Sequence, residues 1–441
     1  MSDTNCPHGW VIAPLGDIAL WGSGGTPSRK NPEYYGGEIP WVKTGDLGPK
    51  ILSSASEFIT ESAVQNSSAK FFPKGSVAIA MYGATIGKTS ILGIDATTNQ
   101  ACAVGQPIPE CTSTEFLFYL LRNEKDNFIA KGKGGAQPNI SQTLIKDHHV
   151  LFPSLAEQKQ VVANLDKLLA QVDPLKTRLD TTPSILKRFR QSVLAAAVSG
   201  RLTEEWRKIN NVSPGSKVAL GTVGYVLAGQ SPSRAEVNTD GKGEPYVTGP
   251  EQWDGRKILH NKWTEYPKRM APNGSIFVTV KGAGVGTTFP GCYAAIGRDV
   301  YAFVTNNDVV YDYILYSIQS SAQEVVLKAK GLIPGLTKAD IVDHNIYLPS
   351  TLEQTEIVRR IEQLFTFADQ IEQRVKDAQF RVNKLTQSIL AKAFRGELTA
   401  EWREQNLDLI SGENSAKALL NRIEVERQLA SSKKQTRKKR A

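Results

Sequence analysis

The stretches "AAVSGRLTEEWRK" (196–208) and "KAFRGELTAEWRE" (392–404) share one pattern, Gly-x-Leu-Thr-x-Glu-Trp-Arg. The likeness extends without a gap over residues 153–208 and 349–404, where 19 of 56 positions are identical. Self-similarity at a fixed offset over this length is the signature of internal duplication. The sequence therefore predicts a chain of two halves, each built on the same plan.

Weaker matches precede each repeat in the same order. "LGDIALWGSGGTPS" (15–28) matches "LGTVGYVLAGQSPS" (220–233), and "FPKGSVAIAMYGATIGKT" (72–89) matches "APNGSIFVTVKGAGVGTT" (271–288). A chain of 441 residues is also too long for one compact core. We predict a variable domain at 1–152, a helical repeat at 153–212, a second variable domain at 213–348, a second helical repeat at 349–405, and a C-terminal helix with a basic tail at 406–441.

The variable domains have the pattern of β-rich structure, because short apolar runs such as "SVAIAMY" lie between Gly, Pro, Asn and Asp. The repeats have a helical pattern: "SLAEQKQVV" opens with a capping box, and apolar heptads run from Leu168 to Ala196 and from Leu364 to Lys392. The predicted fold class is α+β, with two β-rich domains joined by two long antiparallel helices, a coiled coil in pseudo-twofold arrangement. The alternative is that each apolar stripe packs on its own domain.

The heptad seam predicts a distance between the domains. About 28 residues at ~1.5 Å each give a rod of roughly 40 Å, close to one turn of B-DNA at about 34–36 Å. Pro174 follows Asp173 and is predicted to begin a new helix there, since proline suits a first helical turn.

The net charge of +9 gives weak support for a nucleic-acid partner. Residues 1–150 and 213–350 are nearly balanced in charge, and the basic excess lies in 151–212 and 405–441. DNA-binding domains of this composition would need their basic residues on one face. The four cysteines have no metal-ligand spacing, and no signal peptide or spanning segment is evident. We expect a cytoplasmic protein without a metal site or a membrane partner.

Catalytic motifs are incomplete. "GATIGKT" (83–89) has three residues between its glycines where a P-loop needs four, and "NPEYY" (31–35) has Glu33 where adenine methyltransferases have proline. We predict no catalytic residues and no cofactor bound by this chain, and we interpret His148 and His344 as structural histidines.

The order of these parts resembles the specificity subunit of type I restriction-modification enzymes. The resemblance is carried by "LGDI…GGTPS" (15–28), "IPWVKTGDL" (39–47), "GGAQPNIS" (134–141), "PSLAEQKQVV" (153–162) and the two Gly-x-Leu-Thr-x-Glu-Trp-Arg segments. It implies that each variable domain reads one half of a split double-stranded DNA target and that the helices set the gap. It also implies two methyltransferase subunits carrying S-adenosylmethionine, and restriction subunits using ATP and Mg²⁺, around a non-catalytic chain.

The DNA contacts are expected from basic, polar and aromatic residues in loops beside the matched strands, since phosphate contacts position a protein and base-edge contacts specify sequence. The candidates in the first domain are Arg29, Lys30, Tyr34, Lys43, Thr44, Lys88, Lys131, Lys133, Gln137 and Asn139. The candidates in the second domain are Arg234, Trp253, Arg256, Lys257, Lys281, Lys328 and Lys330.

The repeated motif has two interpretations. Gly200 and Gly396 are predicted to end the long helices. The apolar residues after them then either cover the ends of the coil or receive the methyltransferase subunits; they are Leu202, Trp206, Leu398 and Trp402. Two other hypotheses stay open at this point, a duplicated non-DNA adaptor with a coiled-coil spacer and a stand-alone nuclease or methyltransferase.

Overall fold

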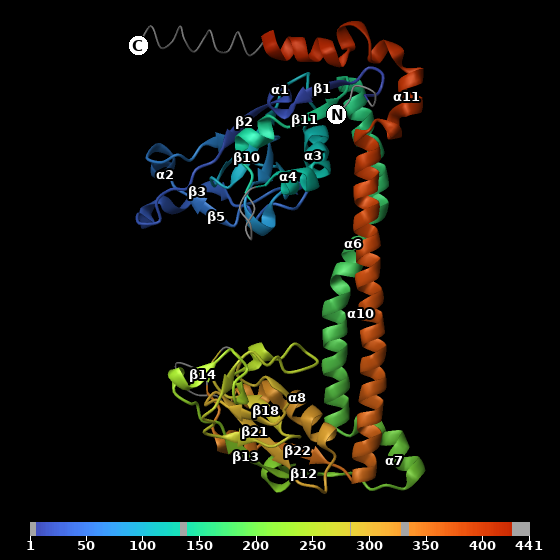
Figure 1. Ribbon diagram of the computed structural model, residues 1–441. Helices are drawn as coiled ribbons and strands as arrows, with labels where there is room; N and C mark the ends of the chain where they lie inside the picture. The colour runs from blue at the N-terminus through green and yellow to red at the C-terminus, as the bar shows by residue number, and fades with distance from the viewer. Residues whose placement is uncertain (1–5, 133–138, 283, 328–334, 426–441) are drawn as a thin grey trace. The chain divides into compact units, whose positions relative to one another are not determined.

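The computed structural model describes residues 6–132, 139–282, 284–327 and 335–425. The chain forms two compact units: unit 1 comprises residues 1–178 and 379–441, and unit 2 comprises residues 179–378. Two long helices, α6 (Leu155–Val198) and α10 (Thr351–Phe394), each contribute one part to either unit (Figure 1). Each unit therefore combines a globular domain with segments from both helical repeats.

Unit 1 is built around two mixed sheets. The first has the order β2-β10-β7-β8-β4, and the second has the order β5-β3-β9-β6. The strands are β2 (Ala19–Ser23), β10 (Cys102–Pro107), β7 (Val77–Ala80), β8 (Thr89–Leu92), β4 (Ile51–Leu52), β5 (Glu57–Ile59), β3 (Tyr35–Val42), β9 (Ala96–Thr98) and β6 (Phe71–Phe72), with β1 (Val11–Pro14) and β11 (His149–Phe152) forming a separate pair. The helices are α1 (Leu15–Ile18), α2 (Glu61–Gln65), α3 (Thr114–Asn123), α4 (Lys125–Lys131), α5 (Gln142–Lys146) and α11 (Ala400–Gln405).

The core of unit 1 joins residues that are far apart in the sequence. Phe116 on α3 is fully buried, and its ring lies 5.3 Å from that of Phe394 at the end of α10. Leu165 on α6 and Leu419 beyond α11 are buried in the same cluster. Burial of such side chains stabilises by about 1.5–3 kcal/mol each. The first domain is thus closed by the carboxyl-terminal part of the second helical repeat.

Unit 2 repeats this plan. Its sheets have the orders β13-β21-β18-β19 and β14-β16-β15-β20-β17. The strands are β13 (Gly224–Ala228), β21 (Val300–Thr305), β18 (Ile276–Thr279), β19 (Thr288–Pro290), β14 (Val237–Asn238), β16 (Trp263–Thr264), β15 (Glu244–Val247), β20 (Ala294–Ile296) and β17 (Met270–Ala271), with β12 (Ser216–Ala219) and β22 (Asn345–Leu348) as the separate pair. Its helices are α7 (Glu204–Asn210), α8 (Tyr311–Leu327) and α9 (Lys338–Val342).

The pairing of strands shows that the two domains are equivalent. β3 pairs in parallel with β9, and β15 pairs in parallel with β20. All other strand pairs of these two sheets are antiparallel. The pairs β1–β11 and β12–β22 are both antiparallel and both lead into a long helix. The predicted α+β class with two β-rich domains and two long helices is confirmed.

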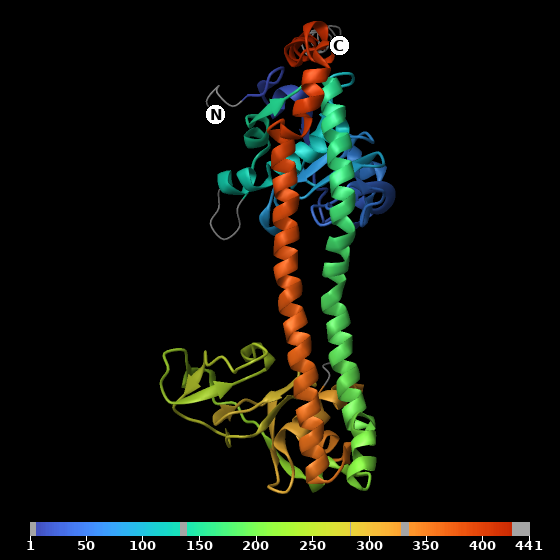
Figure 2. The ribbon, with the colours of Figure 1, turned by 90° about the vertical axis from the view of Figure 1, so that its right-hand side faces the viewer.

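Within each unit the two long helices run antiparallel (Figure 2). In unit 2, Arg207 pairs with Glu353 at the start of α10, and Arg190 pairs with Asp369 further along it. From Arg207 back to Arg190 in the first repeat, the paired residue in the second repeat moves forward from Glu353 to Asp369. The two helices are therefore antiparallel. Both interpretations of the apolar stripes hold in part, since Leu165 of α6 and Leu390 of α10 are buried in one cluster that also contains core residues of the first domain.

The predicted helix start at Pro174 is wrong, because α6 continues through this proline from Leu155 to Val198. A proline inside a helix removes one backbone hydrogen bond and costs about 3 kcal/mol. Val172 and Leu186, on either side of it, remain buried at 6% exposure each. Packing of the apolar face therefore outweighs the local cost. Each helix has 44 residues, longer than the 28-residue seam, because its first turns pack on a domain.

Candidate nucleic-acid interface

The first cluster of residues predicted to contact DNA lies beside the carboxyl end of strand β3 in unit 1. Glu57 accepts a hydrogen bond from Lys43 Nζ at 2.5 Å and one from Arg29 Nη2 at 2.7 Å. The Arg29 guanidinium also lies 4.3 Å from the centre of the Tyr35 ring. The bond from Lys43, together with Arg29, lowers the pKa of the Glu57 carboxyl below its usual value. The structure thus brings Arg29 and Lys43 together on one carboxylate that the sequence analysis missed.

Unit 2 has a contact of opposite charge at the equivalent position. Glu57 lies opposite Trp41 in the β3–β5 ladder, and the carbonyl of Lys262 accepts the N–H of Tyr246 at 2.8 Å. Trp41 and Tyr246 are the third residues of the matching segments "IPWV" and "EPYV". Glu57 and Lys262 therefore occupy the same place in two equivalent sheets.

Glu57 and Lys262 also have different hydrogen-bond partners, Lys43 and Thr248, at matching positions of the two segments. Lys43 follows "IPWV" and Thr248 follows "EPYV", and Lys262 Nζ donates to Thr248 Oγ1 at 2.8 Å. A carboxylate accepts from the amino group of cytosine, whereas an ammonium donates to the acceptors of guanine. The two units thus have residues of opposite charge at one strand position, Glu57 and Lys262, and Lys262 also lies 3.6 Å from Glu251 Oε1. The sequence alone did not predict the equivalence of Glu57 and Lys262, because the two residues lie in segments that do not align.

The remaining candidates of unit 1 make no hydrogen bond or ion pair with Glu57 among the described residues. Lys30 is exposed, Thr44 is partly exposed, and Tyr34 packs beside Trp41. Lys88 is exposed before strand β8, and Asn139 forms an isolated bridge with Tyr82. Lys133 and Gln137 lie outside the described residues.

Lys131 lies beside the buried histidine of the first domain. Its Nζ is 3.0 Å from His148 Nδ1, and His148 Nε2 is 2.7 Å from Glu124. Burial opposes ionisation of Glu124, but the hydrogen bonds from His148, Asn127 and Asn123 hold the pKa of its carboxyl below the usual value. These contacts fit the interpretation of His148 as a structural residue.

The candidates of unit 2 are spread over several loops. The Trp253 ring stacks on Phe289 at 5.6 Å and is partly buried in the domain core. The backbone N–H groups of Arg256 and Lys257 both donate to Asp254, which leaves the two basic side chains exposed in a tight turn. Arg234 and Lys281 are exposed, and Lys328 and Lys330 lie outside the described residues.

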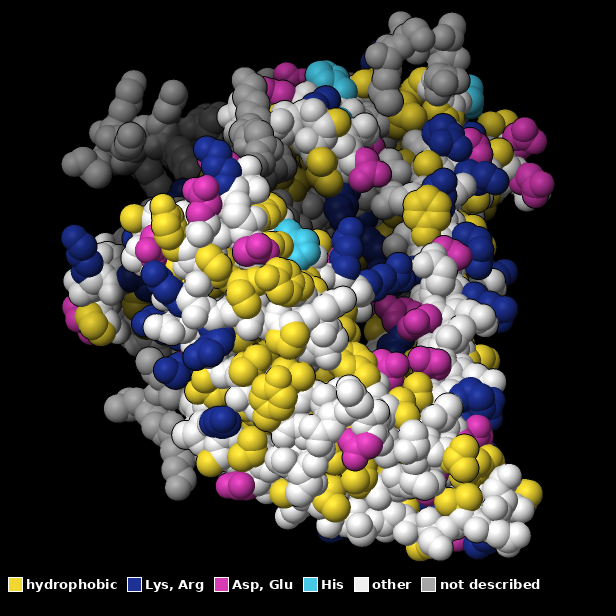
Figure 3. Space-filling view, turned by 60° about the horizontal axis from the view of Figure 1, so that its bottom comes forward, with side chains coloured by type: hydrophobic (Ala, Val, Ile, Leu, Met, Phe, Trp, Pro, Cys, Tyr) yellow, Lys and Arg dark blue, Asp and Glu magenta, His cyan; other side chains and the backbone are white. Residues whose placement is uncertain are grey.

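Basic side chains do not form one continuous field on the face shown in Figure 3. Lysine and arginine are dispersed there among acidic and hydrophobic side chains. This distribution agrees with the near balance of charge in both domains. Any recognition by this face must rest on particular residues more than on bulk charge.

The repeated Gly-x-Leu-Thr-x-Glu-Trp-Arg motif forms a buried polar cluster in each unit. In unit 1, Glu157 Oε1 accepts from Thr399 Oγ1 at 2.7 Å and from Arg403 Nε at 2.9 Å. Arg403 Nη2 also donates to the carbonyl of Gly396 at 2.7 Å. We call this set, Glu157, Thr399, Arg403 and Gly396, the Glu157 cluster.

The same arrangement occurs in unit 2 as the Glu353 cluster, made of Glu353, Thr203, Arg207 and Gly200. Both glutamates are fully buried, and in both the second oxygen, Oε2, accepts no hydrogen bond among the described residues. Gly200 and Gly396 have φ of +72° and +76°, which confirms that they end the long helices in the left-handed conformation. Each helical repeat therefore binds, through its end, the start of the other repeat.

The apolar residues of the motif lie outside these clusters. Leu202 and Leu398 pack against the edges of the two domain cores. Trp206 and Trp402 are both partly exposed. The polar residues of the motif thus hold the helix ends, whereas the tryptophans stay partly exposed.

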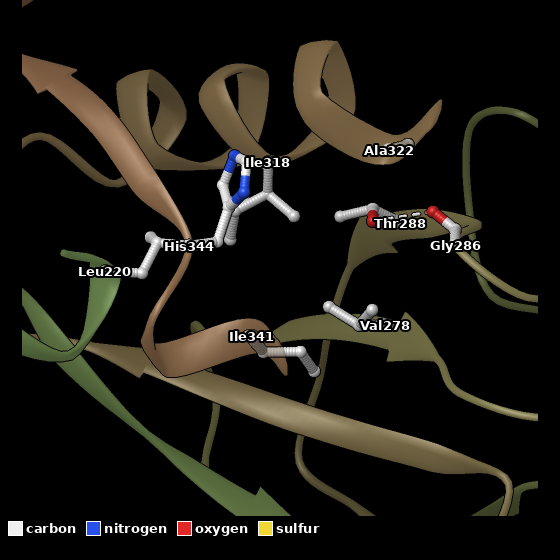
Figure 4. Close-up of a pocket in the computed structure, with 8 residues that line it drawn as sticks. All are labelled: Leu220, Val278, Gly286, Thr288, Ile318, Ala322, Ile341 and His344. Atoms are coloured by element: carbon white, nitrogen blue, oxygen red, sulfur yellow. Dashed lines mark hydrogen bonds between the residues drawn. The ribbon is translucent and has the colours of Figure 1, made fainter. Parts of the chain in front are cut away.

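His344 borders a cavity of about 10 Å³ in unit 2 (Figure 4). Its other lining residues include Leu220, Val278, Ile318 and Ile341. A space of this size holds one water molecule at most, and an apolar lining disfavours even that. The cavity is a packing defect without room for a ligand.

The described residues contain no group of three His, Cys, Asp or Glu placed to hold a metal ion. Burial raises the pKa of the Cys102 thiol to about 12, so it does not act as a nucleophile near neutral pH. In the part of the chain that the structure describes, every helix is too short or too polar to cross a membrane.

Two equivalent domains, two shared helices and a duplicated helix-end motif define one class of protein. The chain belongs to the family described as type I restriction modification DNA specificity domain, which matches residues 7–181 and 216–378. It is a DNA specificity subunit with two recognition domains, and the adaptor hypothesis is not favoured.

Particular relatives make the likeness more specific. The chain is 33% identical over 471 residues to the type I restriction enzyme EcoKI specificity subunit of Escherichia coli (strain K12), covering 100% of both proteins. It is 35% identical over 367 residues to the EcoDI specificity subunit of Escherichia coli, covering 75% of this chain and 80% of that protein. A solved structure from work on the assembly and conformational transition of the type I R-M system shares the fold, with a TM-score of 0.70 and 23% identity over 89% of this chain and 99% of that one.

Proposed function

We propose that units 1 and 2 each read one half of a bipartite, asymmetric DNA target, and that the helices α6 and α10 set the gap between the halves. The observation that carries this proposal is the contact of reversed charge at Glu57 and Lys262. Two domains of one plan that have a carboxylate and an ammonium group at the same strand position are suited to different bases. A target with two unlike halves is the consequence.

In the same proposal the chain recognises DNA and leaves chemistry to partner subunits. Two methyltransferase subunits dock on it, and restriction subunits join them. S-adenosylmethionine, ATP and Mg²⁺ then belong to those partners. The proposal is supported by the incomplete catalytic motifs of this chain and by its kinship to specificity subunits, and a duplicated surface is suited to a partner present twice.

The test is to express the chain together with the methyltransferase subunit of its own restriction-modification system and to map every methylated site in the host genome. We expect one sequence of two short halves separated by a fixed gap. Replacing residues 179–378 with the corresponding part of a relative should change one half and preserve the other. Methylation of a single continuous sequence, or methylation that does not depend on the chain, would refute the proposal.

A further inference from the structure

Unit 1 contains a groove of about 670 Å³ beside the helix pair. Its walls come from the Gly83–Thr89 loop region, from α3 and α4, and from the parts of α6 and α10 that belong to this unit. Five basic side chains line it, with Asp126 as the acidic one: Lys88, Arg122, Lys125, Lys176 and Lys384. We call it the basic groove.

The basic side chains of the groove outnumber its one carboxylate, Asp126, and form no close ion pair with it. None of the five basic side chains forms an ion pair with any residue that the structure describes. Lys384 instead lies over the ring of Phe380, with Nζ 4.5 Å from its centre, and Arg122 lies 5.4 Å from that of Phe118. Phe380 itself is 59% exposed. Five cations and one carboxylate, Asp126, leave the groove with a net positive charge, which raises the local potential and favours an anion.

The groove depends on one glycine. Gly87 has φ of +76°, and a Cβ at this position would lie 2.5 Å from the Lys125 side chain. Any other residue would be strained there and would displace Lys125. The glycine thus allows the Lys125 side chain to pack against the loop that carries Lys88, and both lysines line the groove.

Unit 2 lacks this cluster of charges. By the alignment of the repeats, Lys176 corresponds to Glu372 and Lys384 to Arg188, and Lys88 corresponds to Thr287 in the matching loop. Gln158 accepts from Ser113 and Gln354 accepts from Val310, which aligns α3 with α8. By that alignment Arg122 and Lys125 correspond to Gln319 and Ala322. Four of the five basic residues are therefore absent from the second copy.

We infer that the basic groove binds the sugar-phosphate backbone of double-stranded DNA. The inference rests on the proposed function, and it adds a contact that reads no sequence. A surface that occurs in both units is suited to a partner subunit that is present twice. Within the described ranges the basic groove occurs in unit 1 alone, so it points to a partner without twofold symmetry. In the proposed function that partner is the asymmetric DNA target, whose phosphates are the ligands that lysine and arginine bind.

The test compares the wild-type chain with Lys176→Ala/Lys384→Ala, each assembled with its methyltransferase subunits. Binding is measured over a range of salt concentrations on two probes, a duplex with the mapped target and one without it. We expect the slope of log K against log salt to fall by about 0.9 for each phosphate contact removed, on both probes. The methylated sequence should stay the same.

The matched control is Lys159→Ala/Lys392→Ala, which removes two exposed lysines from the same helices in unit 1 outside the groove. The inference is wrong if the groove variant binds both duplexes like this control. It is also wrong if DNA binding is unchanged and a protein subunit is lost, since the groove then serves an acidic protein surface. If the wild-type assembly binds neither duplex, the proposed function fails as well, which separates the two failures.

Discussion

Glu157 and Glu353 are fully buried carboxylates, and each accepts its hydrogen bonds on one oxygen from an arginine and a threonine of the repeated motif. A buried charge is tolerated when its partner is close and is destabilising when that partner is removed. Each cluster therefore fixes the antiparallel register of the two helices, because the buried glutamate of one repeat is stable only beside the arginine of the other.

Replacing Arg403 with alanine should lower the free energy of unfolding by about 3–5 kcal/mol, because Glu157 would stay buried without its partner. Chemical denaturation of the full chain measures this change. Glu404→Ala, at an exposed neighbouring position, is the control and should change stability by about 0.5 kcal/mol or less. A loss below about 1 kcal/mol in Arg403→Ala would show that the Glu157 cluster does not depend on this charge pair.

Glu57→Lys should change the sequence preference at one position of the half read by unit 1. The substitution places at this site the residue type that unit 2 has at Lys262, and a matched base contact is worth about 1–3 kcal/mol of discrimination. Methylation mapping should show a new base at that position and an unchanged second half. Lys262→Glu is the reciprocal variant and should alter only the other half.

Glu57→Gln keeps the size of the side chain and removes its charge, so it separates loss of recognition from loss of folding. If Glu57→Lys and Lys262→Glu both methylate the wild-type sequence, the contact does not take part in reading.

At the scale of elements, the long helices are the part of the fold that the sequence predicted best. The heptads run through both repeats, and the glycines at their ends adopt the left-handed conformation that helix ends require. Pro174 shows the limit of local rules, because packing of the flanking turns keeps α6 continuous through it.

The polar contacts were harder to predict than the elements. The motif drew attention to its tryptophans, since aromatic residues are common anchors, whereas its arginine makes the buried contact. Arg403 and its partner Glu157 are 246 positions apart, and no local pattern links them. Glu57 and Lys262 are likewise brought into equivalence only by the pairing of strands.

Inserting seven residues at matched positions in α6 and α10 should lengthen the gap in the DNA target. A heptad preserves the apolar stripe and adds about 10 Å at ~1.5 Å per residue, which corresponds to about three base pairs. Methylation mapping measures the gap directly, and the two half sequences should be unchanged. An unaltered gap in a folded, active variant would show that the helices do not set the spacing. Inserting three residues is the control, since it breaks the stripe and should impair assembly.

At the scale of the whole molecule, the duplication predicts the number of partners. Trp206 and Trp402 are partly exposed at equivalent positions after the two helices. In the proposed function each marks the docking surface of one methyltransferase subunit, because two equal surfaces suit two identical partners.

Trp206→Ala and Trp402→Ala should each reduce the assembly by about one methyltransferase subunit, and the double variant should bind none. The mass of the assembled complex measures this number, and DNA binding by the chain should persist. Ile209→Ala, at a position 79% exposed on the same helix as Trp206, is the control and should assemble fully. A complete assembly by the double variant would contradict the docking role.

The composition of unit 1 has a consequence for the order in which the chain folds during synthesis. Domains usually fold as they emerge from the ribosome, with the amino-terminal one first. Here the core around Phe116 includes Phe394 and Leu419, which are translated after all of unit 2. Unit 2 is continuous from 179 to 378 and is completed earlier. The domain that is made first is thus the one that is finished last, and a premature stop after residue 378 would leave unit 2 whole and unit 1 open.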